Sequence, residues 1–277
     1  MNVEIRELRT FTEMQDVPRV QRAIWHFGDS TGFYPPSLLA FSDNGGLVLG
    51  AFDTDTGAMV GFLVSFLARH WDGQLKLYSQ SMGVLPEYRQ ARVAQRLKWR
   101  QREWALAQDL RLVTWTYDPL EMPNARLNIA RLGGLVRRYK RNIYGERFGQ
   151  LNEGLPTDRF VVEWFLDSPR VTAALAGTAQ PPAAEAVTDI AGEGASRRLA
   201  CYRSDATAPA LRVDMPVDLQ ATKARDMALA LDWRLKTREV FESYFARGYA
   251  VTGFVSAGEG DERNNWYVLR NNDWGIS

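Results

Sequence analysis

The residues best suited to bind a ligand lie where an apolar strand gives way to a helix, between Leu77 and Leu97. Pro86 ends the strand because proline cannot donate to a ladder, and a short loop precedes the helix. The free N–H groups at a helix start point into such a loop and, with the helix dipole, favour an anion such as a pyrophosphate. Arg89 and Arg92 would add charge-assisted hydrogen bonds. The alternative is an ordinary strand–loop–helix junction that binds nothing.

Strands and helices alternate around this junction. Apolar runs bounded by turn residues predict strands at 3–8, 47–52, 59–67, 75–85, 112–117 and 160–165. The turn at 53–57 predicts an antiparallel hairpin, and the prolines at 35 and 36 predict a turn that halts any helix. Helices are expected at 11–25, 93–110 and from Pro123 to a glycine C-cap at Gly133. This order predicts an α/β fold.

The C-terminal half differs in composition. Residues 171–196 are rich in alanine and contain no aromatic residue, which indicates a surface linker or long loop. Strands at 211–214, 249–255 and 266–269 then surround a helix at 224–247, whose packing face is formed by Trp233, Val240, Phe241 and Tyr244. We therefore expect three parts: 1–168, a linker or long loop at 169–198, and a C-terminal α/β unit at 199–277 packed on the first.

The junction resembles the acyl-CoA-binding motif of the GNAT superfamily of N-acyltransferases, Val-x-Pro-x-x-Arg-x-x-Gly-x-Gly/Ala before a helix. Val84, Pro86, Arg89 and Ala94 match at the right spacing, whereas Arg92 stands where the family usually has glycine. The resemblance implies a mixed sheet flanked by helices, acetyl-CoA or succinyl-CoA as acyl donor, and no metal. The cofactor-binding residues that it implies are Met82, Gly83, Val84, Arg89, Gln90, Ala91, Arg92, Val93, Ala94, Asn124 and Asn128.

Three longer phrases, at 114–120, 154–160 and 232–235, resemble a longer GNAT subfamily with an extra C-terminal unit, some members of which are linked to N-succinylation of amino acids. The resemblance implies acyl transfer to the amine of a small molecule, with an amino acid as first choice. A protein or peptide acetyltransferase is one alternative. A catalytically weak acyl-CoA-binding or regulatory module is another, because Arg92 replaces the glycine and Ile129 occupies the position of a family tyrosine that protonates the thiolate.

In this reaction the acceptor amine attacks the thioester and must lose a proton. Asp118, at the end of the 112–117 strand, is the predicted catalytic base, and the alternative is that it only caps an Asp-Pro turn. His26 and His70 are further candidates for the base. A backbone N–H near residues 82–84 would stabilise the oxyanion, and Tyr117 or Tyr144 could protonate the thiolate.

Two arginines of the C-terminal helix, Arg234 and Arg238, share one face at a spacing of i, i+4. They could bind a substrate or succinyl carboxylate bidentately, or pair with Asp232 and Glu242 on the surface. Cys201 has no histidine near it in sequence and is expected to be an inert thiol.

The overall composition excludes several classes of protein. Net charge is +1, from 34 basic and 33 acidic residues, so we expect neither a nucleic-acid nor a membrane partner. The basic run from Arg89 to Arg102 is then a solvated helix face. One cysteine and two histidines cannot form a Cys/His zinc site. With no signal-peptide core and no apolar run near the ~20 residues that span a bilayer, we expect a cytoplasmic enzyme acting on a small-molecule amine, with a homodimer as one option.

Overall fold

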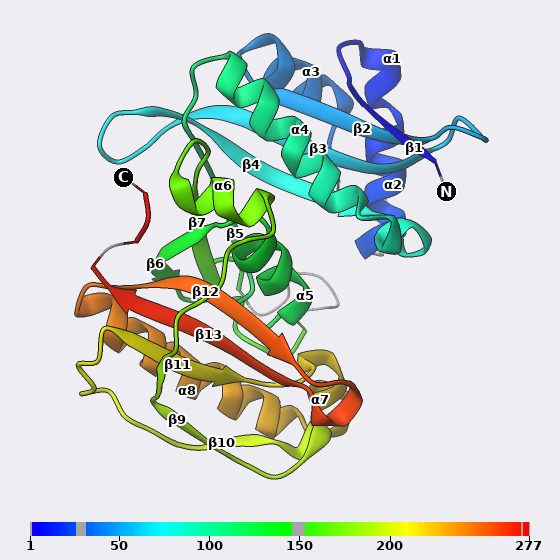
Figure 1. Ribbon diagram of the computed structural model, residues 1–277. Coiled ribbons are helices and arrows are strands. Elements are labelled where there is room, and N and C mark those ends of the chain that lie inside the picture. Colours follow the sequence, from blue (N-terminus) through cyan, green and yellow to red (C-terminus); the bar gives the residue numbers. More distant parts are fainter. Residues whose placement is uncertain (1, 26–31, 146–152, 273, 277) are drawn as a thin grey trace. The chain divides into compact units, whose positions relative to one another are not determined.

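The computed structural model describes residues 2–25, 32–145, 153–272 and 274–276. The chain divides into two compact units, Met1–Trp115 and Thr116–Ser277 (Figure 1). The predicted mixed α/β class is confirmed, since sheets with parallel and antiparallel neighbours are flanked by helices. The elements of the first unit are β1 (Val3–Glu7), α1 (Phe11–Met14), α2 (Asp16–Trp25), α3 (Pro35–Asp43), β2 (Leu47–Asp53), β3 (Met59–Arg69), β4 (Leu75–Val84), the 3₁₀-helix η1 (Pro86–Ala91), α4 (Val93–Ala107) and β5 (Leu112–Tyr117).

The first unit is a sheet between two layers of helices (Figure 1). Its strands follow the order β1-β2-β3-β4-β5, antiparallel except for the parallel pair β4–β5. Alternation from Phe62 to Val64 of β3 explains the layers: Leu63 packs into the core beneath α4, and Phe62 and Val64 into the core beneath α1 to α3. All three side chains are buried, so the strand requires cover on both faces.

The predicted antiparallel hairpin of 47–52 and 59–67 is confirmed as β2–β3. The prediction that the prolines at 35 and 36 stop helix formation was wrong, because they begin α3. Proline is well suited to the first turn of a helix, where its missing N–H would have no intrahelical partner.

The second unit contains a sheet in the order β7-β6-β12-β13-β11-β8 and a separate β9–β10 hairpin. Its elements are α5 (Met122–Ala125), the π-helix η2 (Arg126–Arg131), β6 (Leu135–Lys140), β7 (Arg159–Phe165), α6 (Pro169–Leu175), β8 (Glu185–Ala186), β9 (Thr188–Ala191), the 3₁₀-helix η4 (Gly194–Ser196), β10 (Arg198–Tyr202), β11 (Ala210–Met215), α7 (Leu219–Arg225), α8 (Met227–Ala246), β12 (Tyr249–Ala257), the 3₁₀-helix η5 (Gly260–Glu262) and β13 (Asn264–Asn271).

The predicted packing face of the C-terminal helix is confirmed, because its four residues are fully buried. The helix itself is shorter than predicted. Asp226 is extended and separates α7 from α8, and its side chain accepts a hydrogen bond from the backbone N–H of Leu229 (3.0 Å). An acidic N-cap of this kind satisfies one free N–H at the start of α8.

An aromatic cluster explains why the division does not fall near residue 168. Phe160 on β7 lies 4.7 Å from Phe241 on α8 and 5.4 Å from Tyr267 on β13, measured between ring centroids. Strands before and after the expected boundary therefore share one core. Extra C-terminal strands are present, but the expected split into 1–168 and 199–277 as functional parts stays a prediction.

The segment expected as a linker or long loop, 169–198, contains secondary structure. It includes α6, β8, β9 and η4, and Val171 and Val187 in it are buried. Arg170 anchors α6 through hydrogen bonds to the carbonyl oxygens of Gly133, Gly134, Thr252 and Trp274. Alanine-rich composition hid these elements because short strands need few residues and gain stability from their neighbours rather than from propensity.

Candidate functional site

Strands β4 and β5 form a fork in the first unit. Their parallel register contains the pairs Leu77↔Val113 and Tyr78↔Thr114, whereas β4 continues to Val84. In the described part of the chain no register pair joins residues 79–84 to β5. At 3.3 Å per residue this leaves about 20 Å of strand edge whose backbone groups can pair with an extended ligand.

A β-bulge marks the base of this fork. On the β3 side, Ser65 pairs with Ser79 and Val64 pairs with Ser81, so Gln80 is an extra residue. A bulge bends its strand and increases the local twist. The bend at Gln80 falls two residues beyond the last β4–β5 pair at Tyr78, which explains why the two strands diverge there.

The loop after β4 leads through η1 into α4, and Arg92 joins them in a left-handed conformation (φ 54°, ψ 26°). The first backbone bond of α4 runs from the Arg96 N–H to the Arg92 carbonyl oxygen (3.1 Å), so the N–H groups of Val93 and Ala94 have no intrahelical acceptor. A right-handed turn followed by a left-handed residue is the backbone pattern of anion-binding nests. The first turn of α4 has no acidic residue that would repel an anion.

Side chains fix this loop to the rest of the unit. The Tyr88 hydroxyl donates to Asp53 Oδ2 (2.9 Å), and Arg96 Nη2 donates to the carbonyl oxygen of Val3 (2.6 Å). The N–H of Thr56, together with the Tyr88 hydroxyl, lowers the pKa of Asp53, which therefore stays charged as the acceptor. Arg92 itself is exposed at the loop surface.

The structure brings together nine of the eleven predicted cofactor-binding residues, 82–84 on β4 and 89–94 on η1 and α4. Val84 and Val93 are buried in the core, so only their backbone could meet a ligand. Gly83 has a packing role, because a Cβ there would lie 2.6 Å from Ile24 Cδ1. Asn124 is exposed on α5 and Asn128 is buried in η2, both in the second unit, and their cofactor role stays a prediction.

Asp118, the predicted base, is 7% exposed and already has several partners. Its Oδ1 accepts from the Leu120 N–H (2.9 Å), which confirms the turn cap that we considered as an alternative. Its Oδ2 accepts from Arg234 Nη2 (2.5 Å) and Arg159 Nη1 (3.5 Å). These donors engage both oxygens of the carboxylate, and its catalytic role stays a prediction.

The expected surface partners of the two helix arginines were wrong. Arg234 pairs with Asp118, and Arg238 binds Asp158 bidentately (2.7 and 3.0 Å). Asp232 pairs with Lys236 and Glu242 pairs with Arg141.

Arg234 is only partly satisfied by this pairing. The side chain is 1% exposed, and its Nε and Nη1 are buried without a hydrogen-bond partner in the described residues. Burial would lower its pKa, but the charge of Asp118 and the hydrogen bond to it outweigh burial and raise the pKa, so the guanidinium stays charged. Unpaired buried N–H groups are costly, and an anionic oxygen could accept a hydrogen bond from either of these two nitrogens.

Sequence reasoning missed Glu121, three residues after Asp118. The Gln220 amide donates to its Oε1 (2.6 Å), and burial raises its pKa from the usual value. A carboxyl group that titrates closer to neutral pH is better suited to proton transfer than one held by cations. A second acidic residue between a strand end and a helix start was the signal available in the sequence.

Each remaining candidate either has a structural explanation for its side chain or is outside the described residues. His26 is outside them. His70 is buried in the β3–β4 hairpin with Nδ1 3.0 Å from Asp72 Oδ2. Tyr117 is a core residue whose hydroxyl lies 3.1 Å from that of Tyr267, and burial raises its pKa. The exposed Cys201 has a raised pKa because Asp189 accepts its hydrogen bond, consistent with an inert thiol.

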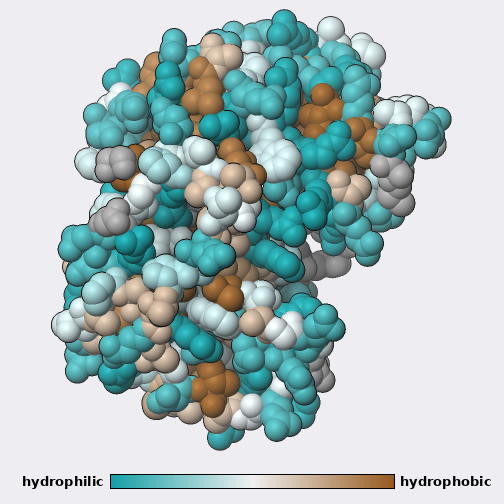
Figure 2. All heavy atoms as spheres, viewed as in Figure 1, coloured by the Kyte–Doolittle hydropathy of each residue, from teal (hydrophilic) through white to brown (hydrophobic). Residues whose placement is uncertain are grey.

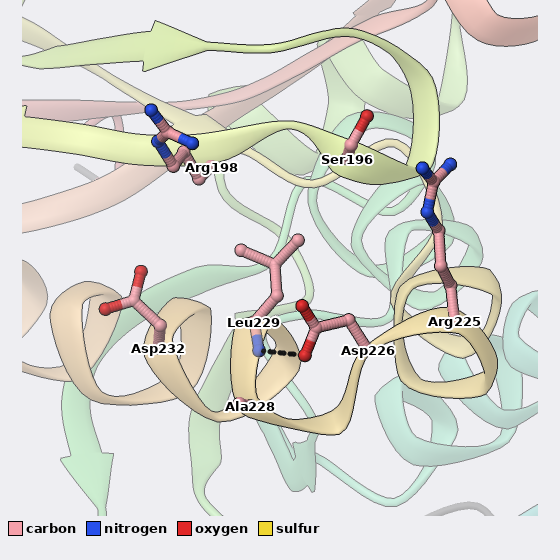
Figure 3. A pocket seen from close by; sticks show the side chains of 7 residues that line it. All are labelled: Ser196, Arg198, Arg225, Asp226, Ala228, Leu229 and Asp232. Carbon is pink, nitrogen blue, oxygen red and sulfur yellow. Dashed lines mark hydrogen bonds between the residues drawn. The ribbon is translucent and has the colours of Figure 1, made fainter.

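A surface hollow of about 430 Å³ lies in the second unit (Figure 3). Its lining residues are Ser196, Arg198, Arg225, Asp226, Ala228, Leu229 and Asp232. Asp226 is engaged in the N-cap of α8 and Asp232 pairs with Lys236, so neither acid is free for a ligand. No predicted site residue lines this hollow.

Figure 2 shows mainly hydrophilic side chains on one face, with small separate apolar patches. Among the described residues, no helix is both long and apolar enough to cross a bilayer. Within the same residues, no three His, Cys, Asp or Glu side chains are grouped so that they could hold a metal ion.

Comparison with known proteins finds similarity only among solved structures. No protein-family model and no curated protein matches this chain. A Salmonella typhimurium protein solved with acetyl-CoA as its cofactor is 18% identical over 60% of this chain and 94% of its own (TM-score 0.47). A GNAT-family acetyltransferase from Streptococcus pneumoniae is 14% identical over 58% and 98% (TM-score 0.46). An Arabidopsis thaliana protein in complex with acetyl-CoA is 14% identical over 59% and 99% (TM-score 0.47). Similarities this low assign neither a family nor an activity to this chain.

Proposed function

We propose that this protein is a CoA-dependent N-acyltransferase that transfers an acetyl or succinyl group to the amine of a small molecule, most simply an amino acid. The observation that carries the proposal is the β4–β5 fork continued by the η1–α4 loop. One continuous stretch, from the bulge at Gln80 to Ala94, offers a free strand edge for an extended arm and a left-handed nest with free N–H groups for a pyrophosphate. In an acyl-CoA, an extended pantetheine arm is likewise followed by a pyrophosphate.

The acceptor is proposed to carry a carboxylate. Arg234 supports this choice, because its buried Nε and Nη1 have no partner among the described residues and an oxygen of a carboxylate could accept a charge-assisted hydrogen bond from either of them. Replacing it with lysine keeps a cation beside Asp118 but removes the planar guanidinium group with its two unpaired nitrogens. An Arg234→Lys variant should therefore lose its preference for amines with a carboxylate over amines without one.

Glu121 is proposed as the proton acceptor in preference to Asp118. Its raised pKa and its neutral partner, the Gln220 amide, suit general base catalysis, whereas both oxygens of Asp118 are engaged.

One set of observations favours the alternative of an acyl-CoA-binding module without turnover. Arg92 replaces a glycine, Ile129 is buried and cannot donate a proton, and Asp118 is held by two guanidinium groups. Binding of CoA without thiol release would support this alternative.

The decisive experiment combines calorimetric CoA binding with thiol release by the full chain. Acetyl-CoA and succinyl-CoA are each offered with D- and L-amino acids, amines that lack a carboxylate, and peptides. We expect thiol release that depends on the amine and is fastest with amino acids. Release with peptides only would favour the protein acetyltransferase, and a folded chain that binds no CoA would refute the proposal.

A matched pair of variants locates the binding site. Ala94→Glu adds a negative charge to the first turn of α4, where it would repel a pyrophosphate although the helix dipole tolerates it. Ala107→Glu makes the same change at the exposed last residue of α4. We expect loss of CoA binding only in the first. Val93 is unsuitable for this test because its side chain is fully buried.

A further inference from the structure

Lys98 is a lysine inside the first unit. It belongs to the basic run on α4 that we expected to be solvated, yet it is 2% exposed. Its Nζ donates to Ser79 Oγ (2.9 Å) and Gln101 Oε1 (3.1 Å), and it lies 3.7 Å from the centroid of the Trp115 ring. No carboxylate pairs with this ammonium in the part of the chain that the structure describes. Its partners are thus two neutral polar side chains and an aromatic face.

These partners lie on both arms of the β4–β5 fork. The last backbone pair is Tyr78↔Thr114, and Ser79 and Trp115 are the next residues of the two strands. The Lys98 ammonium therefore joins β4 to β5 one position beyond these register pairs. It does so through a hydrogen bond to one strand and a cation–π contact with the other.

The contacts continue to the bulge. The Gln101 amide donates to Ser65 Oγ (2.8 Å), and Ser65 is the β3 residue paired with Ser79. Ser65, Ser79, Lys98 and Gln101 are all buried. One polar network thus holds three strands at the level of Gln80, where β4 bends away.

Stability alone does not explain a buried polar network at this position. Burying an ammonium without a carboxylate is costly, and burial lowers the pKa of Lys98 well below its usual value. A methionine would fill a similar volume without this cost, and replacing buried charges with apolar residues is often neutral or stabilising.

We propose that Lys98 is a positioning residue that sets the opening of the β4–β5 fork, and with it the direction of the free backbone groups after the bulge that bind the acyl thioester. This inference rests on the proposed function. The pyrophosphate loop lies at the far end of β4, beyond Val84, so Lys98 acts on the reacting end of the donor rather than on its anchoring end.

The test uses Lys98→Met and Ser79→Ala in the full chain, with Arg100→Met as control. Arg100 is exposed on the same helix and pairs with Glu103. For Lys98→Met we expect kcat for thiol release to fall roughly ten- to a hundredfold, as a misplaced reacting group does. Affinity for CoA should change by less than about threefold and the melting temperature should not fall. The effects of Lys98→Met and Ser79→Ala on kcat should not add, because they remove the same contact.

A second readout does not depend on turnover. Amide hydrogen exchange of residues 79–84 in the free protein should be roughly five- to tenfold faster in Lys98→Met, the effect of one lost hydrogen bond, and unchanged in Arg100→Met. If the parent protein binds no CoA, the proposed function fails while exchange still tests the fork. Unchanged exchange in Lys98→Met, or an unchanged kcat in a parent that turns over, would overturn the inference.

Discussion

The left-handed conformation of Arg92 leads to a prediction about its replacement by glycine and alanine. Both variants lose the guanidinium group, so a difference between them reports on the backbone alone. A non-glycine residue in this region costs about 1–2 kcal/mol, and glycine gives back about 0.4–1 kcal/mol through the greater freedom of the unfolded chain. With φ at 54°, we expect Arg92→Gly to be more stable than Arg92→Ala by about 0.5–1 kcal/mol.

Ligand affinity should behave differently from stability in these two variants. If the Arg92 side chain contacts a CoA phosphate, both variants should bind CoA more weakly by about 1.5–3 kcal/mol, the value of a hydrogen bond to a charged group. Arg92→Gly should lose less of this than Arg92→Ala, because glycine allows the phosphate to approach the backbone of the nest. Calorimetric titration with CoA and thermal unfolding of the same samples give both quantities.

Asp109 provides the control for the backbone effect. It adopts the same conformation (φ 55°) at the other end of α4, and its side chain is almost fully exposed. Asp109→Gly should therefore stabilise the chain without any change in CoA affinity. If Arg92→Gly is no more stable than Arg92→Ala, the conformation at Arg92 stores no strain. If both variants bind CoA as tightly as the parent, Arg92 does not contact the ligand.

Three further predictions concern proton transfer, pH and packing. Glu121→Gln should lower kcat roughly 10²–10⁴-fold. When the rate of the parent is measured against pH, it should fall on acidification at a higher pH than an ordinary glutamate would give, because burial raises the pKa of Glu121. Lys98→Met should remove a rise of stability with pH. Between the lowered pKa of Lys98 and its usual 10.5, the unfolded parent chain binds more protons than the folded one, so the parent gains stability as pH increases through that interval. Denaturant titrations at each pH should show this gain in the parent and not in the variant. Trp233→Ala should cost about 3–5 kcal/mol in the free energy of unfolding because the ring is fully buried. The control Leu235→Ala, two residues away and 39% exposed, should cost less than about 1 kcal/mol. Equal losses would show that the buried face of the helix is misassigned.

The sequence predicted the elements whose signals are local. The β2–β3 hairpin, the end of β4 before Pro86 and the start of α4 at Val93 follow from turn residues and apolar periodicity within a few positions. β6 was missed because Arg137 and Arg138 interrupt its apolar pattern. Arg137 is accommodated by two hydrogen bonds to Glu163 on the neighbouring strand (both 2.8 Å), a partner that no local pattern reveals.

For the candidate site, too, local features could be predicted from the sequence and distant contacts could not. The loop from Arg89 to Ala94 was found because its chemistry lies in consecutive residues. The partner of Arg234 was not found, because Asp118 is 116 positions away in sequence. The inward direction of Lys98 was hidden by the charged residues around it, since composition describes a helix surface on average and not which single side chain is buried.

The shared aromatic core of the second unit has a consequence for synthesis on the ribosome. Residues 1–117 contain strands β1 to β5 in full, so they can begin to fold as soon as they emerge. The β6–β7 hairpin cannot do so, because its neighbour β12 and the ring of Tyr267 arrive about a hundred residues later, which is roughly 5–20 s at typical elongation rates. During that interval Phe160 and Tyr139 lack the side chains that cover them in the finished fold. The nascent chain should therefore be most prone to aggregation, and most dependent on chaperones, between the completion of β7 and the release of the C-terminus.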